Sequence, residues 1–105
     1  MTVRYKNAKV DLTTTNATDI VTIANATTAV IKSILVSEDS GNADTITLTL
    51  TDSASAIFSL FKVKAVSANT TVELLTAPMV LAESEKITAQ AATANRLHVV
   101  VSYME

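Results

Sequence analysis

The only histidine, His98, is the first residue in this sequence that could take part in catalysis. A catalytic base needs a nucleophile or an orienting acid within reach, and His98 instead lies between Leu97 and Val99 in an alternating apolar stretch. A histidine in such a stretch is typical of a strand surface or an interface. No set of polar residues suggests a pocket with perturbed pKa values, so the sequence predicts no catalytic residues and a protein that is not an enzyme.

A group of acidic residues is the other candidate for chemistry: Glu38, Asp39, Asp44 and Asp52 lie around two expected loops. Oxygen-rich loops can bind calcium, but the order of residues here does not match the calcium loop D-x-[DN]-x-[DN]-G-x₅-E. We therefore expect solvated turns at these positions. A zinc site is not expected either, because the chain has one His and no Cys. The sequence thus predicts no metal and no cofactor.

The size and charge of the chain limit the class of protein. Its 105 residues suit a single domain, which we expect to span residues 1–105 with a polar loop or arm at 13–18. The net charge of −2 argues against a nucleic-acid partner, which usually requires a basic face. The first residues lack the apolar core of a signal peptide, and no stretch approaches a membrane span. We therefore expect a soluble protein without a membrane partner.

Alternation of apolar and polar residues is the main structural signal. In TITLTLTD (45–52), Ile46, Leu48 and Leu50 are expected to face inward and the Thr residues outward, as in a half-buried strand. Further strands are expected at 3–12 with a slip near Asn7, 19–23, 29–37, 56–66, 70–76, 79–81, 86–91 and 96–103. Short strands with turns every 8–12 residues predict an all-β, single-domain antiparallel β-sandwich of about eight strands.

The turns must form with little help from glycine. The sequence contains one Gly, Gly41, and one Pro, Pro78. We expect Asn, Asp and Ser side chains to stabilise the turns by bonding to nearby backbone groups. Pro78 is expected to restrict the following strand to an edge or a bend.

Two expected strands are apolar on both faces. Together the strands therefore carry more apolar surface than one small core can bury. In 56–66, Ile57, Phe61, Val63 and Ala65 are expected to share one face with Ser59, and both Phe58 and Phe61 are expected in the core. Surplus apolar strand surface is ordinarily buried by subunit association. We therefore predict a homo-oligomer, with a trimer as one expected state. The predicted interface consists of Val30, Ile34, Val36, Phe58, Leu60 and Val100.

The segment NTTVELLTAPMVLAESEKITAQAATANRLHVVVSYME (69–105) resembles a pattern in small tailed-bacteriophage virion proteins of jelly-roll type. That pattern has a Thr-rich strand, an aliphatic V-L, a tight turn, an I-x-x-x-A strand and a final L-x-V-x-V-S-Y-x-E. The matching residues are Val80, Leu81, Ile87, Ala91, Leu97, Val99, Val101, Ser102, Tyr103 and Glu105. The sequence departs from this pattern in the tight turn, where it has Ser84-Glu85 and the pattern usually has Gly-Asp. The preceding segment IKSILVSEDSGNADTITLTLTD also fits the middle of the pattern.

This resemblance implies a jelly-roll-like sandwich that is a virion building block without catalysis and is present in symmetric multiples. It carries over no functional residue. The expected role is that of a capsid decoration or cement protein, assembled in the host cytoplasm and bound to the major capsid protein or other virion proteins. A tail, neck, baseplate or fibre component is the alternative within this class. Outside it, a carbohydrate-binding module is the alternative, although the chain has no Trp and only four aromatic residues (two Tyr and two Phe).

Overall fold

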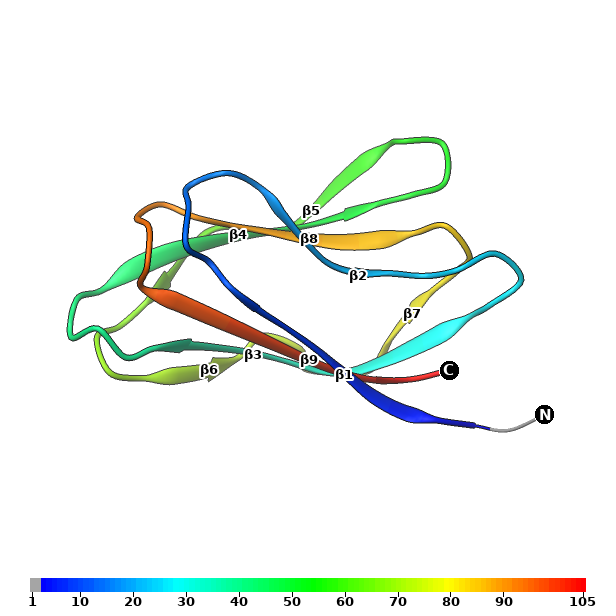
Figure 1. Ribbon diagram of the computed structural model, residues 1–105, viewed down its shortest axis with the longest axis horizontal. Helices are drawn as coiled ribbons and strands as arrows, with labels where there is room; N and C mark the ends of the chain where they lie inside the picture. The colour runs from blue at the N-terminus through cyan, green and yellow to red at the C-terminus, as the bar shows by residue number, and fades with distance from the viewer. Residues whose placement is uncertain (1–2) are drawn as a thin grey trace.

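Two antiparallel sheets face each other in the computed structural model, which describes residues 3–105 (Figure 1). Sheet A has the order β1 (Tyr5–Asp11), β9 (Leu97–Met104), β3 (Ala29–Glu38) and β6 (Thr71–Glu73), and β7 (Met79–Leu81) also pairs with β3. Sheet B has the order β2 (Thr18–Thr22), β8 (Lys86–Ala91), β4 (Asp44–Thr51) and β5 (Ile57–Val66). The first and last strands are neighbours, and the chain passes repeatedly between the sheets, as in a jelly roll.

The core lies between the sheets and is built from the inward residues of alternating strands. Ile46 and Leu48 of β4 are fully buried and Leu50 is half-buried, as the alternation in TITLTLTD predicts. The inward residues of β8 and β9 pack against them, among them Ile87, Val99 and Val101. Each fully buried Val, Leu or Ile contributes about 1.5–3 kcal/mol, so this apolar layer is the main source of stability.

The two edge strands β1 and β5 differ from the sequence-based prediction in their regularity. β1 pairs with β9 without interruption from Tyr5 to Asp11, so the slip expected near Asn7 is wrong. β5, by contrast, changes register twice along β4. Phe61 lies opposite the buried Leu48, whereas Ala65 lies opposite the outward Thr45, so the face that we predicted for β5 is not continuous.

One of these irregularities places a β-branched residue in an unfavourable backbone conformation. Val63 of β5 has a φ of 53°, and its N–H donates to the Thr47 hydroxyl at 3.1 Å. A left-handed backbone costs a residue with a Cβ roughly 1–2 kcal/mol. Val63 therefore holds local strain at the edge of sheet B.

We predict that Val63→Gly stabilises the protein by up to about 1 kcal/mol, because relief of this strain exceeds the roughly 0.5–1 kcal/mol that the greater freedom of unfolded Gly costs. Urea unfolding curves of the variant and the wild type measure the difference. Lys62→Gly is the matched control, since Lys62 has an ordinary φ. It should lose about 0.5–1 kcal/mol, and an equal loss in both variants would contradict the strain at Val63.

The turns between strands contain residues with positive φ in place of glycine. These are Ala26, Ser55, Asn69, Ser84 and Asn95, together with Gly41. Ser84 adopts a φ of 64°, so this turn forms without the Gly that the phage pattern carries. Its hydroxyl donates to Asn25 Oδ1 at 2.9 Å, and its N–H donates to the Ile23 carbonyl at 2.9 Å. Local hydrogen bonds thus accompany the unfavourable backbone of this turn.

The segment 12–17 connects β1 in sheet A to β2 in sheet B. The Gln90 side chain donates to the Thr15 carbonyl at 2.9 Å and ties this loop to β8. Within residues 3–105, no helix is long and apolar enough to cross a membrane.

Candidate assembly surfaces

Two of the six predicted interface residues lie inside the core. Ile34 and Val36 are fully buried, so their prediction as surface residues is wrong. The reason is a register shift between Ile31 and Ser33, where Lys32 is an extra residue in β3. The shift reverses which alternate positions face inward, so Val30 stays outside while Ile34 and Val36 turn toward sheet B.

The outer face of sheet A carries the remaining apolar residues of β3 and β9. Val30 lies opposite Met104 on one side and Val80 on the other, and Met104 lies opposite Tyr5. Directly opposed residues share a face, so Tyr5, Met104, Val30 and Val80 form one line across β1, β9, β3 and β7, here named the apolar row. Tyr5 is 80% exposed and Val80 is 60% exposed. The apolar row is therefore open to a partner.

A second apolar pair lies farther along the same face. Val100 is half-buried beside Leu35, with Lys9 and Glu73 at the two ends of the line that they form. Val30 and Val100 are thus on one face of sheet A, separated by a line of polar residues that includes Asn7 and Ser102.

The edge strand β5 of sheet B bears the other exposed apolar residues. Ile57, Phe58 and Val63 are all exposed there, and we name them the β5 patch. They lie on both faces of the strand, because Ile57 is opposite the outward Thr51 and Phe58 is opposite the inward Leu50. Phe58 is 53% exposed, so its prediction as a core residue is wrong, whereas Leu60 is half-buried. In Figure 1 the β4–β5 hairpin extends away from the rest of sheet B, and Phe58, which is opposite Leu50, lies near the end of this hairpin.

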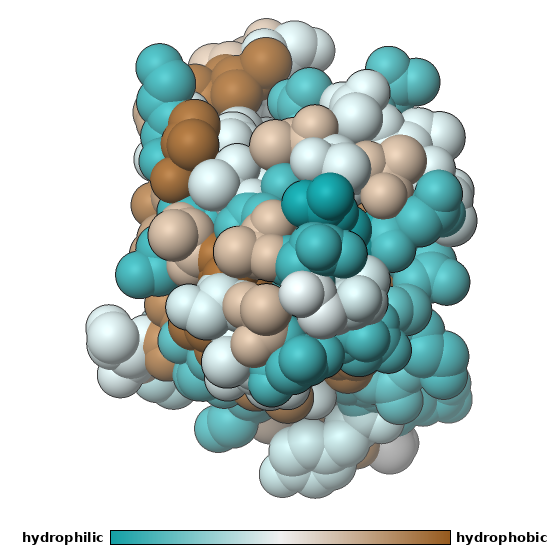
Figure 2. Space-filling model, turned by 90° about the vertical axis from the view of Figure 1, so that its left-hand side faces the viewer, coloured by the Kyte–Doolittle hydropathy of each residue, from teal (hydrophilic) through white to brown (hydrophobic). Residues whose placement is uncertain are grey.

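Hydrophobic side chains are unevenly distributed over the surface. In the end view of Figure 2 they gather along the left margin and at the top, while hydrophilic residues cover most of the right side. Burial against a partner is favourable only where the surface is apolar, so this distribution favours contacts at particular parts of the surface over non-specific association.

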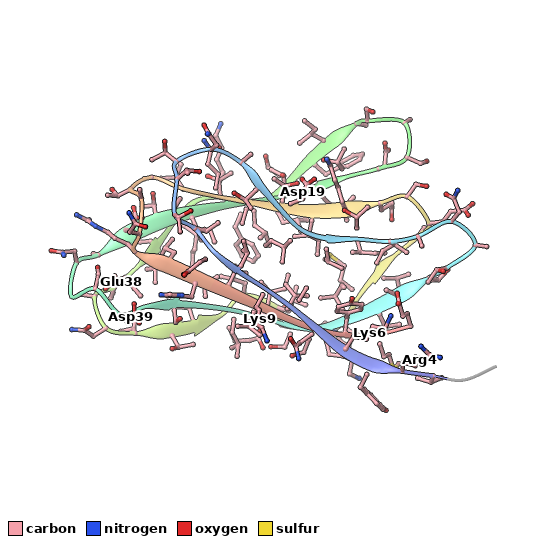
Figure 3. The ribbon with its side chains drawn as sticks, viewed as in Figure 1. Arg4, Lys6, Lys9, Asp19, Glu38 and Asp39 are labelled. Atoms are coloured by element: carbon pink, nitrogen blue, oxygen red, sulfur yellow. The ribbon has the colours of Figure 1, made fainter. Side chains whose placement is uncertain are left out.

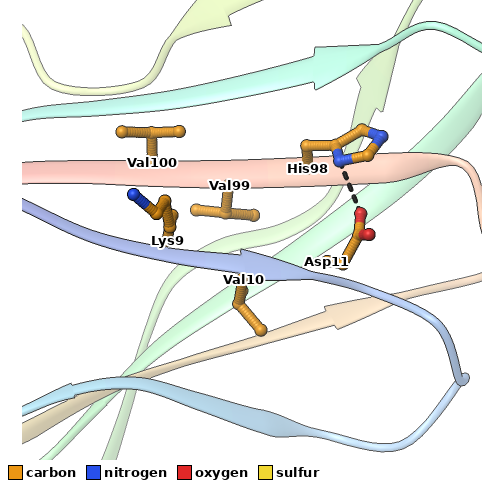
Figure 4. A pocket seen from close by; sticks show the side chains of 6 residues that line it. All are labelled: Lys9, Val10, Asp11, His98, Val99 and Val100. Carbon is orange, nitrogen blue, oxygen red and sulfur yellow. Dashed lines mark ion pairs between the residues drawn. The ribbon is translucent and has the colours of Figure 1, made fainter.

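His98 lies on the outer face of sheet A between two carboxylates. Its Nδ1 is 2.5 Å from Asp11 Oδ1 (Figure 4). Its Nε2 is 3.1 Å from Asp39 Oδ1. Ser37 is directly opposite His98 on β3, but both ring nitrogens already face carboxylates and neither is left to activate its hydroxyl. The arrangement is therefore a polar bridge between β1, β9 and the loop after β3, and it does not have the geometry of a catalytic triad.

A hollow of about 290 Å³ adjoins His98, lined by Lys9, Val10, Asp11, His98, Val99 and Val100 (Figure 4). Pockets that enclose small organic ligands usually measure about 300–1,000 Å³ and bury most of the ligand. This hollow is at the lower limit of that range and lies on a sheet face. It does not provide an enclosed binding site.

The acidic loop at the end of β3 is built around Glu38, which is buried. The carboxylate accepts hydrogen bonds from the Ser40 hydroxyl and from the N–H groups of Ser40 at 2.9 Å, Gly41 at 3.1 Å and Asn69 at 3.2 Å. Burial alone would raise the pKa of Glu38, but these bonds outweigh it and lower the pKa from 4.5 to about 2. Glu38 thus joins the β3–β4 loop to the β5–β6 loop (Figure 3).

Other acidic side chains play the same part in other loops. Asp44 is buried and accepts from the Thr93 N–H at 3.1 Å, so our expectation of solvated turns is wrong for both Glu38 and Asp44. Desolvation would raise the pKa of Glu73, but hydrogen bonds from Ser33, Ile34 and Leu75 hold it below its ordinary value. Among residues 3–105, no group of three or more His, Asp or Glu side chains is arranged to hold a metal ion.

Comparisons with known proteins bear on the fold. The chain matches no protein-family model and no curated protein sequence. It is similar to a chain in a solved structure of Bacillus endospore appendages, which are described as a novel family of disulfide-linked pili. The TM-score is 0.60, the sequence identity is 11%, and the match covers 98% of this chain and 87% of that chain. The fold is shared. This agrees with the predicted all-β sandwich, and at this identity the likeness extends to the fold alone.

Proposed function

We propose that this chain is a structural subunit, without enzymatic activity, of an assembly that contains many copies of it. The observation that carries the proposal is the presence of exposed apolar residues on both sheets, the apolar row on sheet A and the β5 patch on sheet B. A subunit that contacts neighbours through two different surfaces can be incorporated into a ring, a shell or a filament. Polar groups such as Glu38, Asp44 and His98 here form contacts within loops and between strands.

For the kind of assembly, we propose a bacteriophage virion, in which the chain binds as a capsid decoration protein to the major capsid protein. The support is the resemblance of residues 69–105 to small phage virion proteins of jelly-roll type. On this proposal the chain reaches the virion in the host cytoplasm.

A filament is the second candidate, favoured by the fold that the chain shares with a protein of the Bacillus endospore appendages. Those pili are described as disulfide-linked, and the 105 residues of this chain contain no Cys. On this candidate, subunits would be held by their apolar surfaces and by strand pairing. Electron microscopy of particles or fibres that contain the chain separates a shell from a filament, because the two differ in symmetry.

A carbohydrate-binding module has less support. Sugar sites use exposed aromatic rings that lie together, whereas the most exposed rings here, Tyr5 and Phe58, belong to opposite sheets. A clear hit on a glycan array would overturn this view.

We predict that Phe58→Lys and Val80→Lys each reduce assembly, because each replaces an exposed apolar side chain by a charge. Light scattering at several concentrations should show a multiple of 11.1 kDa for the wild type and a shift toward 11.1 kDa for the variants. Ser53→Lys and Thr76→Lys are matched controls, since they add the same charge at exposed polar positions nearby. A wild-type mass equal to one subunit at every concentration would refute the structural proposal.

A further inference from the structure

The N-terminal strand β1 leaves half of its backbone hydrogen-bonding groups without a neighbouring strand. Arg4 and Glu105 exchange two backbone hydrogen bonds of 2.8 and 3.0 Å, and the Leu12 N–H donates to the Leu97 carbonyl at 3.0 Å. Hydrogen-bonded pairs alternate along an antiparallel ladder, so the even-numbered residues of β1 bond to β9. The N–H and C=O groups of Tyr5, Asn7 and Lys9 and the N–H of Asp11 therefore point to the open edge of sheet A, where the Asp11 carbonyl already accepts from the Thr13 N–H at 2.9 Å.

The other edges of the two sheets have features that oppose strand addition. β2 changes register between Asp19 and Val21, and β5 changes register twice and carries Lys62 and Lys64. β6 and β7 are three residues long each, and Pro78 directly precedes β7. β1 has seven residues in one uninterrupted register, without a bulge or a proline. Figure 1 shows it at the near edge of sheet A, in front of β9.

β1 carries the charged residues Lys6, Lys9 and Asp11, of which the two Lys side chains are labelled in Figure 3. The Lys6 ammonium is neutralised by the carboxylate of Glu105. Lys9 and Asp11 are of opposite sign, and their side chains lie on the outer face together with Tyr5 and Asn7. The open backbone groups of such an edge can pair with those of a second copy that runs antiparallel, provided that like charges are not placed directly opposite one another.

We infer that β1 pairs antiparallel with β1 of a second copy of this chain around a two-fold axis, with Ala8 opposite Ala8. In this register Tyr5 faces Asp11 and Asn7 faces Lys9, so all four outward residues of each strand take part. A shift of two residues in one direction would bring Lys9 opposite Lys9, which is unfavourable. A shift in the other direction would leave Asp11 beyond the end of the partner strand, because β1 begins at Tyr5. The inference rests on the proposed function and specifies one contact of the assembly.

A single cysteine can test this register directly, because the natural sequence has none. Across the axis the two Ala8 residues would form a non-hydrogen-bonded pair with Cα atoms about 4.5 Å apart, within the range of a disulfide. Under mild oxidation, Ala8→Cys should therefore convert mostly to a covalent dimer on non-reducing gels. Asn7→Cys and Lys9→Cys are matched controls. Each cysteine would lie diagonal to its symmetry mate, roughly 7–8 Å away, and should cross-link poorly alone. An equal mixture of the two controls should form the mixed dimer.

A second variant tests the contact without a cysteine. The Asn7 N–H points to the open edge, so Asn7→Pro removes one intermolecular donor and leaves the bonds between β1 and β9 in place. Asn7→Val keeps the N–H and is the control. Analytical ultracentrifugation should show weaker dimerisation for Asn7→Pro only, at unchanged circular dichroism.

These experiments can refute the β1 pairing without refuting the proposed structural role. A wild-type oligomer in which Ala8→Cys stays uncross-linked and Asn7→Pro associates normally would overturn the β1 pairing and leave the structural role standing. Cross-linking of Asn7→Cys or Lys9→Cys alone, in place of Ala8→Cys, would overturn the register. A wild type that remains a single subunit at all concentrations would overturn both the pairing and the proposed function.

Discussion

Replacing Ile34 by Ala is expected to lower the free energy of unfolding by about 2–5 kcal/mol. Ile34 is completely buried in β3, the strand that joins β9 to both β6 and β7 in sheet A. Removal of its side chain loses apolar burial and leaves a cavity between the sheets that the surrounding strands cannot fully close. Because a domain of this size is stabilised by only about 5–15 kcal/mol, urea unfolding should show a large shift of the midpoint.

The neighbouring residue provides the control for this prediction. Leu35 is 37% exposed on the outer face of sheet A, so Leu35→Ala should cost less than about 1 kcal/mol. The two variants remove side chains of equal size from adjacent positions, and their difference measures only which face each side chain occupies. Equal losses, or a larger loss for Leu35→Ala, would contradict the register shift at Lys32.

The second large effect is expected at Glu38, where Glu38→Gln should lower the melting temperature by several degrees. An amide nitrogen cannot accept the N–H hydrogen bonds that one carboxylate oxygen of Glu38 accepts, so buried donors in two loops would lose their partner. Thermal unfolding followed by circular dichroism measures the change. Asp39→Asn is the matched control, because the Asp39 side chain is exposed and its loss should have little effect.

The same variant should also change the response of the protein to acid. The folded-state pKa of Glu38 is about 2, below its ordinary value of 4.5, so the folded protein binds fewer protons than the unfolded chain between these two values. The stability that this carboxylate contributes is therefore complete above pH 4.5 and is lost as the pH falls toward 2. The pKa of Glu73 is also lowered in the folded protein, so its contribution to stability is likewise lost as the pH falls. Glu38→Gln should flatten this dependence without abolishing it, and an unchanged slope would contradict the role of Glu38.

The fold was predictable from residue patterns where strands are regular. Thr45 to Thr51 alternates without a break, and a slip of one residue would exchange its two faces, so the inward position of Ile46 and Leu48 follows from the sequence. The prediction failed where an extra residue enters a strand. Nothing in AVIKSILVS indicates that Lys32 is that residue, and Ile34 and Val36 were consequently assigned to the wrong face.

The role of the acidic residues was even harder to predict from the sequence. Glu38 contacts the backbone of Asn69, which is 31 residues away, and such a contact depends on the folded arrangement of two loops. One signal was present in the composition, since a chain with a single Gly must support its turns by other means. Six of its ten acidic side chains accept backbone N–H groups in or next to loops: Glu38, Asp44, Asp52, Glu73, Glu83 and Glu85. We expected Asn, Asp and Ser in this role and did not foresee Glu.

The position of β9 has a consequence for how the protein reaches its native state. This strand is the last in the sequence, yet it lies between β1 and β3 and carries most of the pairing in sheet A. A nascent chain on the ribosome therefore cannot complete that sheet until residues 97–104 have emerged from the exit tunnel. Folding must then close a loop of almost the full chain length, which places this protein among the slow, topologically complex folders that take milliseconds to seconds.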